Sequence, residues 1–505
     1  MAKSDTAPKR KIKFKEEISS KVNIIDETKD VLIQLKDEAG ETLGSTFNLP
    51  LNTSVEKLQN ICKKLKNEDD RQLYSFFLKN VEISTSLYET IKDDRTIDCE
   101  SVLDIIYQPQ ANFKVLAVTR CSSSIPGHAG AILDVQCSPD GRYLASSSGD
   151  TTVRFWDVNT DTPQFMCKGH KHWVLFVAWS PCGRKLASGC KNGLVMIWDP
   201  TTGKQIGRPL SGHSKWIMSI VWKPLHLDGS SRILASSSKD ATIRIWDTVL
   251  GTCLMILSSH LQSVTCIRWS GANLIYSSSQ DRTIKVWQPD KGTLCRTLEG
   301  HGHWVNHVAL NTDYVMRTGA FDPADANKRN RLDSSSQLDG LLIKNLTKRE
   351  QKLCPEKMVS CSDDHTMSLW QPEQDKKPLC KMVGHQQAIN EAVFSPDGRL
   401  LASASFDKSV KLWNGVSGTF IVTLRGHIQE VYQVCWSADS RMLCSASADS
   451  TLKVWDSKGK LLYDLPGHAD QVYALDWSPD GQRVVSGGKD KVLKVLVMMM
   501  MTTSL

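Results

Sequence analysis

"GHQQAINEAVFSPDGRLLASASFDKSVKLWN", residues 384–414, contains the pattern that organises most of this chain. A Gly-His pair opens it, an alternating apolar run leads to "SPDG", and a run of small residues precedes an apolar run that ends at a tryptophan. The Gly-His pair recurs with its glycine at 127, 169, 212, 300, 384, 426 and 467, and a degenerate Ser-His pair begins at 259. The spacings are 42, 43, 47, 41, 84, 42 and 41 residues, which indicates a repeat architecture.

Each unit has room for three short strands, and a fourth strand across the junction completes one four-stranded blade. A period of about 40–45 residues with these marks is the signature of WD repeats. We therefore predict a mainly β chain, with an eight-bladed WD-repeat β-propeller at 112–497 and a small α+β ubiquitin-like domain at 23–111. The segment 112–120, "NFKVLAVTR", is predicted to supply the outer strand of the last blade and close the ring.

The repeated polar residues are predicted to be structural. A Ser-His-Asp catalytic set would occur once, whereas His, Ser, Asp and Trp recur around the ring, which favours a hydrogen-bond network that ties the strands of each blade. Asn192 replaces the acid in the second unit, and Leu496 stands where the last tryptophan is due. We assign to these tetrads His128, Asp150, Trp156, His170, Trp198, His213, Asp240, Trp246, Asp281, Trp287, His301, Asp364, Trp370, His385, Asp407, Trp413, His427, Asp449, Trp455, His468 and Asp490.

Three further tryptophans are not required by the repeat. Trp173, Trp216 and Trp304 stand just before the innermost strand, which predicts a place on the rim of the central channel on one face. Exposed rim aromatics are typical interface anchors, although packing on neighbouring loops is an alternative. The equivalent positions hold Ala131, Ser263, Ala388, Glu430 and Gln471.

The same face is predicted to carry a positive rim. Lys191, Lys239 and Lys489 each stand directly before the tetrad acid position. The net charge of +7 over 505 residues permits contact with nucleic acid or acidic partners without requiring it. The 15 cysteines form no CxxC pair, which indicates reduced thiols in a cytosolic or nuclear protein.

The remaining segments are predicted to be accessory. Residues 1–22 are a basic flexible tail whose "PKRKIKFK" is similar to a nuclear-import tag, and 498–505 are a divergent, methionine-rich tail. The polar insertion at about 321–357 is either disordered or functional. No apolar run of about 18 residues is present, so we expect no membrane contact.

Residues 30–108 lack the repeat marks and predict a β-β-α-β-β order, from "DVLIQLKDE" to "VLDIIYQP". With this front end, "GDTTVRFWD", "SQDRTIKVW", "GHGHWVN" and "LPGHADQVYALDWSPDGQRV" make the chain similar to the Notchless family from about residue 30 to 495. The resemblance implies a non-enzymatic assembly factor of the nucleolus and nucleoplasm, a monomer within a larger complex. Its propeller would dock on the large-subunit precursor particle, which consists of protein and ribosomal RNA, and some members are linked to a Notch pathway protein.

The resemblance also gives a role to Glu100, which is otherwise an ordinary surface glutamate beside a strand. In the Notchless family a glutamate just before the final strand of the ubiquitin-like domain completes the Mg²⁺ site of the AAA ATPase midasin. Glu100 holds that position in "DCESVLDIIYQP", so the chain would need no cofactor of its own and the partner would hold the metal. The alternatives are a WD-repeat substrate receptor or scaffold of a ubiquitin-ligase or signalling complex, and an enzyme, for which no catalytic motif is present.

Overall fold

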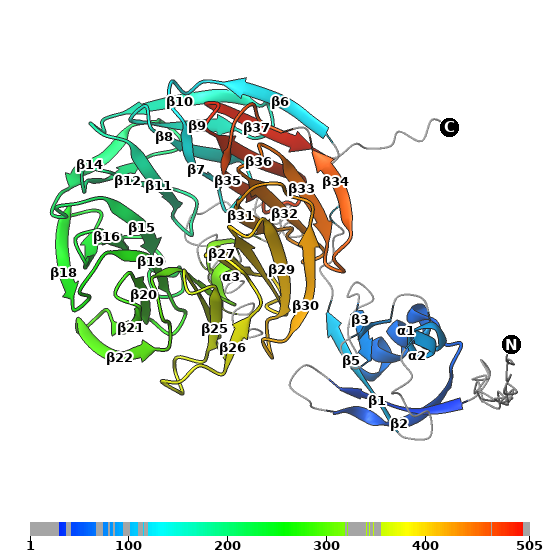
Figure 1. The fold of residues 1–505 in the computed structure, drawn as a ribbon. Coiled ribbons are helices and arrows are strands. Elements are labelled where there is room, and N and C mark those ends of the chain that lie inside the picture. The colour runs from blue at the N-terminus through cyan, green and yellow to red at the C-terminus, as the bar shows by residue number, and fades with distance from the viewer. Residues whose placement is uncertain are drawn as a thin grey trace, which may run out of the picture. The chain divides into compact units, whose positions relative to one another are not determined.

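The computed structural model describes residues 30–36, 42–66, 74–78, 81–83, 86–93, 102–109, 115, 120–318, 321, 340, 343, 347, 355–465 and 467–497. The chain forms two compact units, Met1–Asn112 and Phe113–Leu505, which divide it one residue beyond the predicted boundary (Figure 1). The tails at 1–22 and 498–505 lie outside the described residues, as does most of the insertion at 321–357. No helix in the described ranges is long and apolar enough to cross a membrane.

The N-terminal unit is a sheet with the strand order β2-β1-β5-β3-β4, accompanied by helices. Its elements are β1 (Asp30–Lys36), β2 (Thr42–Pro50), α1 (Val55–Lys66), β3 (Tyr74–Leu78), β4 (Val81–Glu82), α2 (Leu87–Asp93) and β5 (Leu103–Pro109). The first and last strands pair in parallel at the centre of the sheet. Leu58 and Cys62, four residues apart on one face of α1, are buried in the core. The predicted strand order is present, with the short β4 and α2 added before β5.

The described residues of the second unit form eight four-stranded antiparallel sheets, which we call blades 1–8. Blade 1 consists of β7 (Ile132–Cys137), β8 (Tyr143–Ser148), β9 (Thr152–Asp157) and β10 (Thr162–Lys168), and blade 2 of β11 (Val174–Trp179), β12 (Leu186–Cys190), β13 (Val195–Trp198) and β14 (Gln205–Leu210). Blade 3 consists of β15 (Ile217–Trp222), β16 (Ile233–Ser238), β17 (Thr242–Asp247) and β18 (Thr252–Ser258), and blade 4 of β19 (Val264–Trp269), β20 (Ile275–Ser279), β21 (Thr283–Gln288) and β22 (Thr293–Glu299). Blade 5 consists of β23 (Val305–Leu310), β24 (Met358–Ser362), β25 (Thr366–Trp370) and β26 (Cys380–Val383), and blade 6 of β27 (Ile389–Phe394), β28 (Leu400–Ser405), β29 (Ser409–Asn414) and β30 (Phe420–Arg425). Blade 7 consists of β31 (Val431–Trp436), β32 (Met442–Ser447), β33 (Leu452–Asp456) and β34 (Leu461–Leu465), and blade 8 of β35 (Val472–Trp477), β36 (Arg483–Gly488), β37 (Val492–Val497) and β6 (Arg120–Pro126).

The innermost strands of neighbouring blades pack side by side in a closed ring, with β7 between β35 and β11 (Figure 1). Side chains also link the blades through hydrogen bonds. Asp134 of blade 1 accepts the backbone N–H of Val177 in blade 2 at 2.9 Å, and Asp476 of blade 8 accepts that of Cys137 in blade 1 at 2.8 Å. The predicted mainly β propeller of four-stranded blades is therefore confirmed.

The ring is closed by β6, which pairs antiparallel with β37 and so joins the two ends of the propeller in blade 8. The prediction that 112–120 forms this strand was wrong, because the strand occupies Arg120–Pro126. The apolar residues of 112–120 had suggested that this segment forms the outer strand. Outer strands are instead largely exposed and end directly before the Gly-His pair, as β30 does before Gly426.

A short helix of blade 5, α3 (Asp313–Thr318), lies inside the ring (Figure 1). It directly follows β23, so it lies at the opposite end of that strand from Trp304. Asp313 pairs with Arg268 of blade 4 at 3.1 Å, and Arg317 pairs with Asp476 of blade 8 at 3.0 Å. The apolar side of α3 packs with side chains of blades 2 and 3 in a cluster of Cys182, Leu225, Val315 and Met316. The helix therefore bridges four blades.

Candidate interaction surface

The tetrad of blade 1 is a buried chain of hydrogen bonds. His128 Nδ1 lies 2.8 Å from the Asp150 carboxylate, and His128 Nε2 lies 2.8 Å from Ser146 Oγ. The indole N–H of Trp156 donates to the same hydroxyl oxygen at 2.8 Å. Burial raises the pKa of Asp150, but hydrogen bonds from His128 and Thr152 outweigh it and hold that pKa well below its usual 3.8. The serine oxygen is thus occupied by two partners and buried.

The contacts of the histidine with an acid and a serine recur in blades 3 to 8. His213, His301, His385, His427 and His468 each lie between an acid and a serine, as His128 does. Sequence reasoning recognised the recurring serines only as a residue type, and it missed one histidine: His260, which lies 2.7 Å from Asp281 and 2.8 Å from Ser277. The Ser-His pair at 259–260, at the repeat spacing, was the signal that identifies it.

Blade 2 departs from the pattern. His170 lies 2.7 Å from Ser188 Oγ, and Trp198 donates to that oxygen at 2.7 Å. Asn192, in the place of the acid, is exposed, and His170 Nδ1 has no hydrogen-bond partner among the described residues. Burial lowers the pKa of His170 from 6.5 to about 4.

The turn after each tetrad serine positions the side chains on this face. The residue after the acid position has a positive φ, for example 79° at Gly193 and 67° at Ala241. This left-handed residue reverses the chain between the second and third strands. The backbone N–H of Lys191 then donates to the carbonyl of Trp173 at 2.9 Å, and that of Lys239 to the carbonyl of Trp216 at 2.9 Å. Rim tryptophan and lysine are thereby brought together by the backbone.

Trp173, Lys191, Trp216 and Lys239 form a continuous array, which we call the tryptophan–lysine row. The Lys191 ammonium lies 4.8 Å from the ring centroid of Trp173 and 4.5 Å from that of Trp216. The Lys239 ammonium lies 4.6 Å from the Trp216 ring. The two indoles remain 49% and 37% exposed, so they are not buried by neighbouring loops. The row spans blades 2 and 3.

The other two predicted rim residues lie apart from the row. Trp304 of blade 5 is 42% exposed, and its ring packs on His303 with centroids 5.3 Å apart. Lys489 of blade 8 is paired with Asp470 at 3.2 Å. The structure therefore separates two lysines that contact tryptophan from one that is neutralised by an acid, a distinction that the sequence positions do not make.

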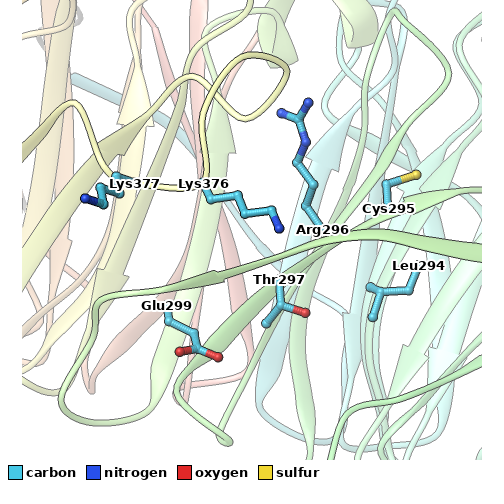
Figure 2. A pocket seen from close by; sticks show the side chains of 7 residues that line it. All are labelled: Leu294, Cys295, Arg296, Thr297, Glu299, Lys376 and Lys377. Atoms are coloured by element: carbon cyan, nitrogen blue, oxygen red, sulfur yellow. The ribbon is translucent and has the colours of Figure 1, made fainter.

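A hollow on the outside of the ring lies between β22 of blade 4 and the β25–β26 connection of blade 5 (Figure 2). Its charged lining consists of Arg296, Glu299, Lys376 and Lys377. The Arg296 guanidinium donates to the carbonyl of Pro372, which links the two blades. This hollow is separate from the tryptophan–lysine row, since it involves outer strands and not the innermost ones.

Glu100 lies outside the described residues, so the structure does not bear on its position. The strand that follows it, β5, begins at Leu103, one residue after the predicted start at Val102.

Two family models match the chain. The NLE (NUC135) domain matches residues 31–91, within the N-terminal unit. The WD domain, G-beta repeat, matches seven segments, which together leave out most of blade 5 with its insertion. They are 119–157, 161–199, 203–247, 251–288, 376–414, 418–456 and 459–495.

Similar proteins cover most of the chain. Protein Notchless of Drosophila melanogaster is 52% identical over 73% of this chain and 75% of its own length. The Notchless protein homolog of Arabidopsis thaliana is 49% identical over 79% and 83%, and Ribosome assembly protein 4 of Saccharomyces cerevisiae is 42% identical over 76% and 78%. Among solved structures, the computationally designed Ika8 protein has a TM-score of 0.58 at 26% identity, over 75% of this chain and 100% of its own.

Proposed function

The chain belongs to the Notchless family, and from that membership we propose that it is a non-enzymatic assembly factor for the large ribosomal subunit. The observation that carries the proposal is the 42% identity, over three quarters of both chains, to a protein named for ribosome assembly. Such a factor works in the nucleolus and nucleoplasm, where precursor particles mature. The role in Notch signalling stays a prediction.

A scaffold role agrees with how the tetrads are used. Their His, Asp and Ser side chains resemble hydrolytic machinery by type, but each serine oxygen in the seven blades that have the tetrad tryptophan accepts an indole N–H. A hydroxyl held in this way strengthens the blade and is poorly placed to attack a substrate. Among the described residues, the remaining candidates for a functional role are therefore surface residues that could bind a partner.

The propeller is proposed to dock on the precursor particle through the face that bears Trp173, Trp216 and Trp304. Aromatic side chains that are one-third to one-half exposed contribute little to the core, and a truncated interface anchor typically costs about 2 kcal/mol or more. Changing all three to alanine should release the full-length protein from large-subunit precursors in a sucrose gradient, with only a small change in melting temperature. Unchanged co-sedimentation of the folded variant would refute this docking face.

The N-terminal unit is proposed to bind midasin through Glu100. Mg²⁺ prefers oxygen ligands in near-octahedral geometry and usually keeps exchangeable waters, so a carboxylate from a partner can displace one and bond directly. Such a contact is directional and depends on the metal, which suits a site through which an ATPase pulls on its substrate.

Pull-downs of the full-length chain with the metal-binding adhesion domain of midasin test this contact. Glu100→Ala should abolish binding, and Glu100→Asp should weaken it strongly because the side chain is one methylene shorter. Chelation of Mg²⁺ should reproduce the alanine result with the wild-type chain. Full binding by the folded Glu100→Ala variant would return this residue to an ordinary surface position.

A further inference from the structure

Hydrogen bonds fix the backbone of the tryptophan–lysine row. Both lysines and both tryptophans are held by the recurring backbone hydrogen bond between rim and turn, and the turns are part of the tetrad framework. Trp173 and Trp216 flank the same Lys191 ammonium, so their rings are close enough for one short ligand to contact both. A backbone fixed in this way has little conformational freedom to lose when a ligand binds, whereas the lysine side chains can reorient.

Further exposed lysines lie beside the row. Lys171 and Lys215, in the loops that carry the two tryptophans, are exposed. Blade 2 has the neutral Asn192 in place of an acid, and the acid of blade 3, Asp240, is paired with His213 at 2.9 Å. Blade 8 differs, because its equivalent lysine is neutralised by an acid. Among the described residues no ion pair joins Lys191 or Lys239 to a carboxylate, so the row combines flat aromatic faces with lysines that are available to a ligand.

We propose that the tryptophan–lysine row binds a short unpaired segment of RNA, with bases stacked on the indoles of Trp173 and Trp216 and phosphates on Lys191 and Lys239. Stacking of a base on an aromatic side chain is stronger than an exposed cation–π contact, so bases can displace the ammonium groups from the ring faces. The displaced ammoniums then pair with phosphates. An acidic peptide could form ion pairs with the lysines, but its carboxylates would gain little from stacking on two adjacent aromatic faces.

This inference rests on the proposed function, because it names the part of the precursor particle that the row would contact. It also specifies the nucleic acid: a single strand has accessible base faces, whereas a duplex hides them. Contact with phosphates makes affinity fall with salt, and the slope of log affinity against log salt is about −0.7 for each single-strand phosphate contact.

Fluorescence anisotropy with the full-length chain and a labelled, unstructured RNA of about 12 nucleotides tests the proposal. Trp173→Ala and Trp216→Ala should each weaken binding about tenfold, as expected for the loss of one stacked base. Lys191→Ala with Lys239→Ala should reduce the salt slope by about 1.4. Two variants on the same face serve as matched controls and should bind normally: Lys408→Ala, since blade 3 has Ala241 at that position, and Ile428→Ala, whose side chain is 76% exposed.

Three outcomes would overturn the proposal: no binding of the RNA by the wild-type chain, equal binding of a duplex, or normal binding by the tryptophan variants. If polyglutamate displaces the RNA, and the tryptophan variants bind the RNA with the affinity of the wild-type chain, the row would instead be a site for an acidic peptide. Sedimentation with precursor particles separates this inference from the proposed function. If the wild-type chain co-sediments with the particles but does not bind the RNA, only the assignment of the row as an RNA site is refuted. If the chain binds the RNA but does not co-sediment, the particle role is refuted.

Discussion

A single exchange at the residue scale separates blade 2 from the others. Where the other blades place a carboxylate beside the histidine, Asn192 points to solvent and leaves His170 Nδ1 without a described partner. Burial then decides the protonation of His170, and its pKa falls to about 4. As pH drops below 6.5 the unfolded chain takes up the proton first, so stability that is present above 6.5 is lost as pH falls toward 4. The loss amounts to about 3 kcal/mol at most.

Asn192→Asp should restore a partner for His170. We expect the pKa of His170 to rise and the free energy of unfolding to increase by about 1 kcal/mol at neutral pH, as for one new buried hydrogen bond. Chemical denaturation at several pH values, with an NMR titration of the His170 ring, measures both effects. Asn192→Ala is the control and should keep the wild-type loss of stability between pH 6.5 and 4. An unchanged acid dependence in the aspartate variant would contradict this account.

At the scale of elements, the closing strand β6 is the most consequential. It completes blade 8 and leaves β37 without an unpaired edge, which protects the sheet from pairing with other chains. The preceding segment also contributes, because Val115 is buried against blades 7 and 8 and its N–H donates to Asp439 at 2.9 Å.

Two truncations should isolate the contribution of β6. Both chains lack the N-terminal unit, but one begins at residue 120 and the other at residue 127. The shorter chain should be much less stable, because each lost ladder hydrogen bond costs about 0.5–1.5 kcal/mol and the edge of β37 becomes exposed. Thermal unfolding and light scattering measure stability and aggregation. Equal melting temperatures would contradict the assignment of β6 as the closing strand.

Periodicity allowed the propeller and most histidine, acid and tryptophan members of the tetrads to be predicted, because the blades repeat the same local contacts apart from the changes in blades 2 and 8. His260 was left out although its Ser-His pair stands at the repeat spacing. The closing strand was predicted too early in the chain because 112–120 is apolar. The position directly before the Gly-His pair is the better signal for an outer strand. Contacts between distant segments have no local signal. Examples are α3 inside the ring and the buried Glu356, which accepts hydrogen bonds from Ser270 at 2.5 Å and Thr312 at 2.6 Å.

The whole molecule divides its proposed work between two units. The propeller has a network of hydrogen bonds within blades, side-chain links between blades and a helix that bridges four of them. Such a body can hold the backbone of the tryptophan–lysine row in place, which lowers the conformational cost of binding. The N-terminal unit has its own core and does not depend on that surface, so particle binding and midasin binding should be separable by mutation.

The pairing of β6 with β37 also sets an order of events during synthesis. The β6 strand ends at Pro126, and its partner begins only at Val492. At about 5–20 residues per second, the ribosome needs on the order of 20–70 seconds to make the intervening chain. Throughout that interval β6 has emerged without a partner and blade 8 cannot form. Until β37 has been made, the edge of β6 that will pair with it is therefore unpaired.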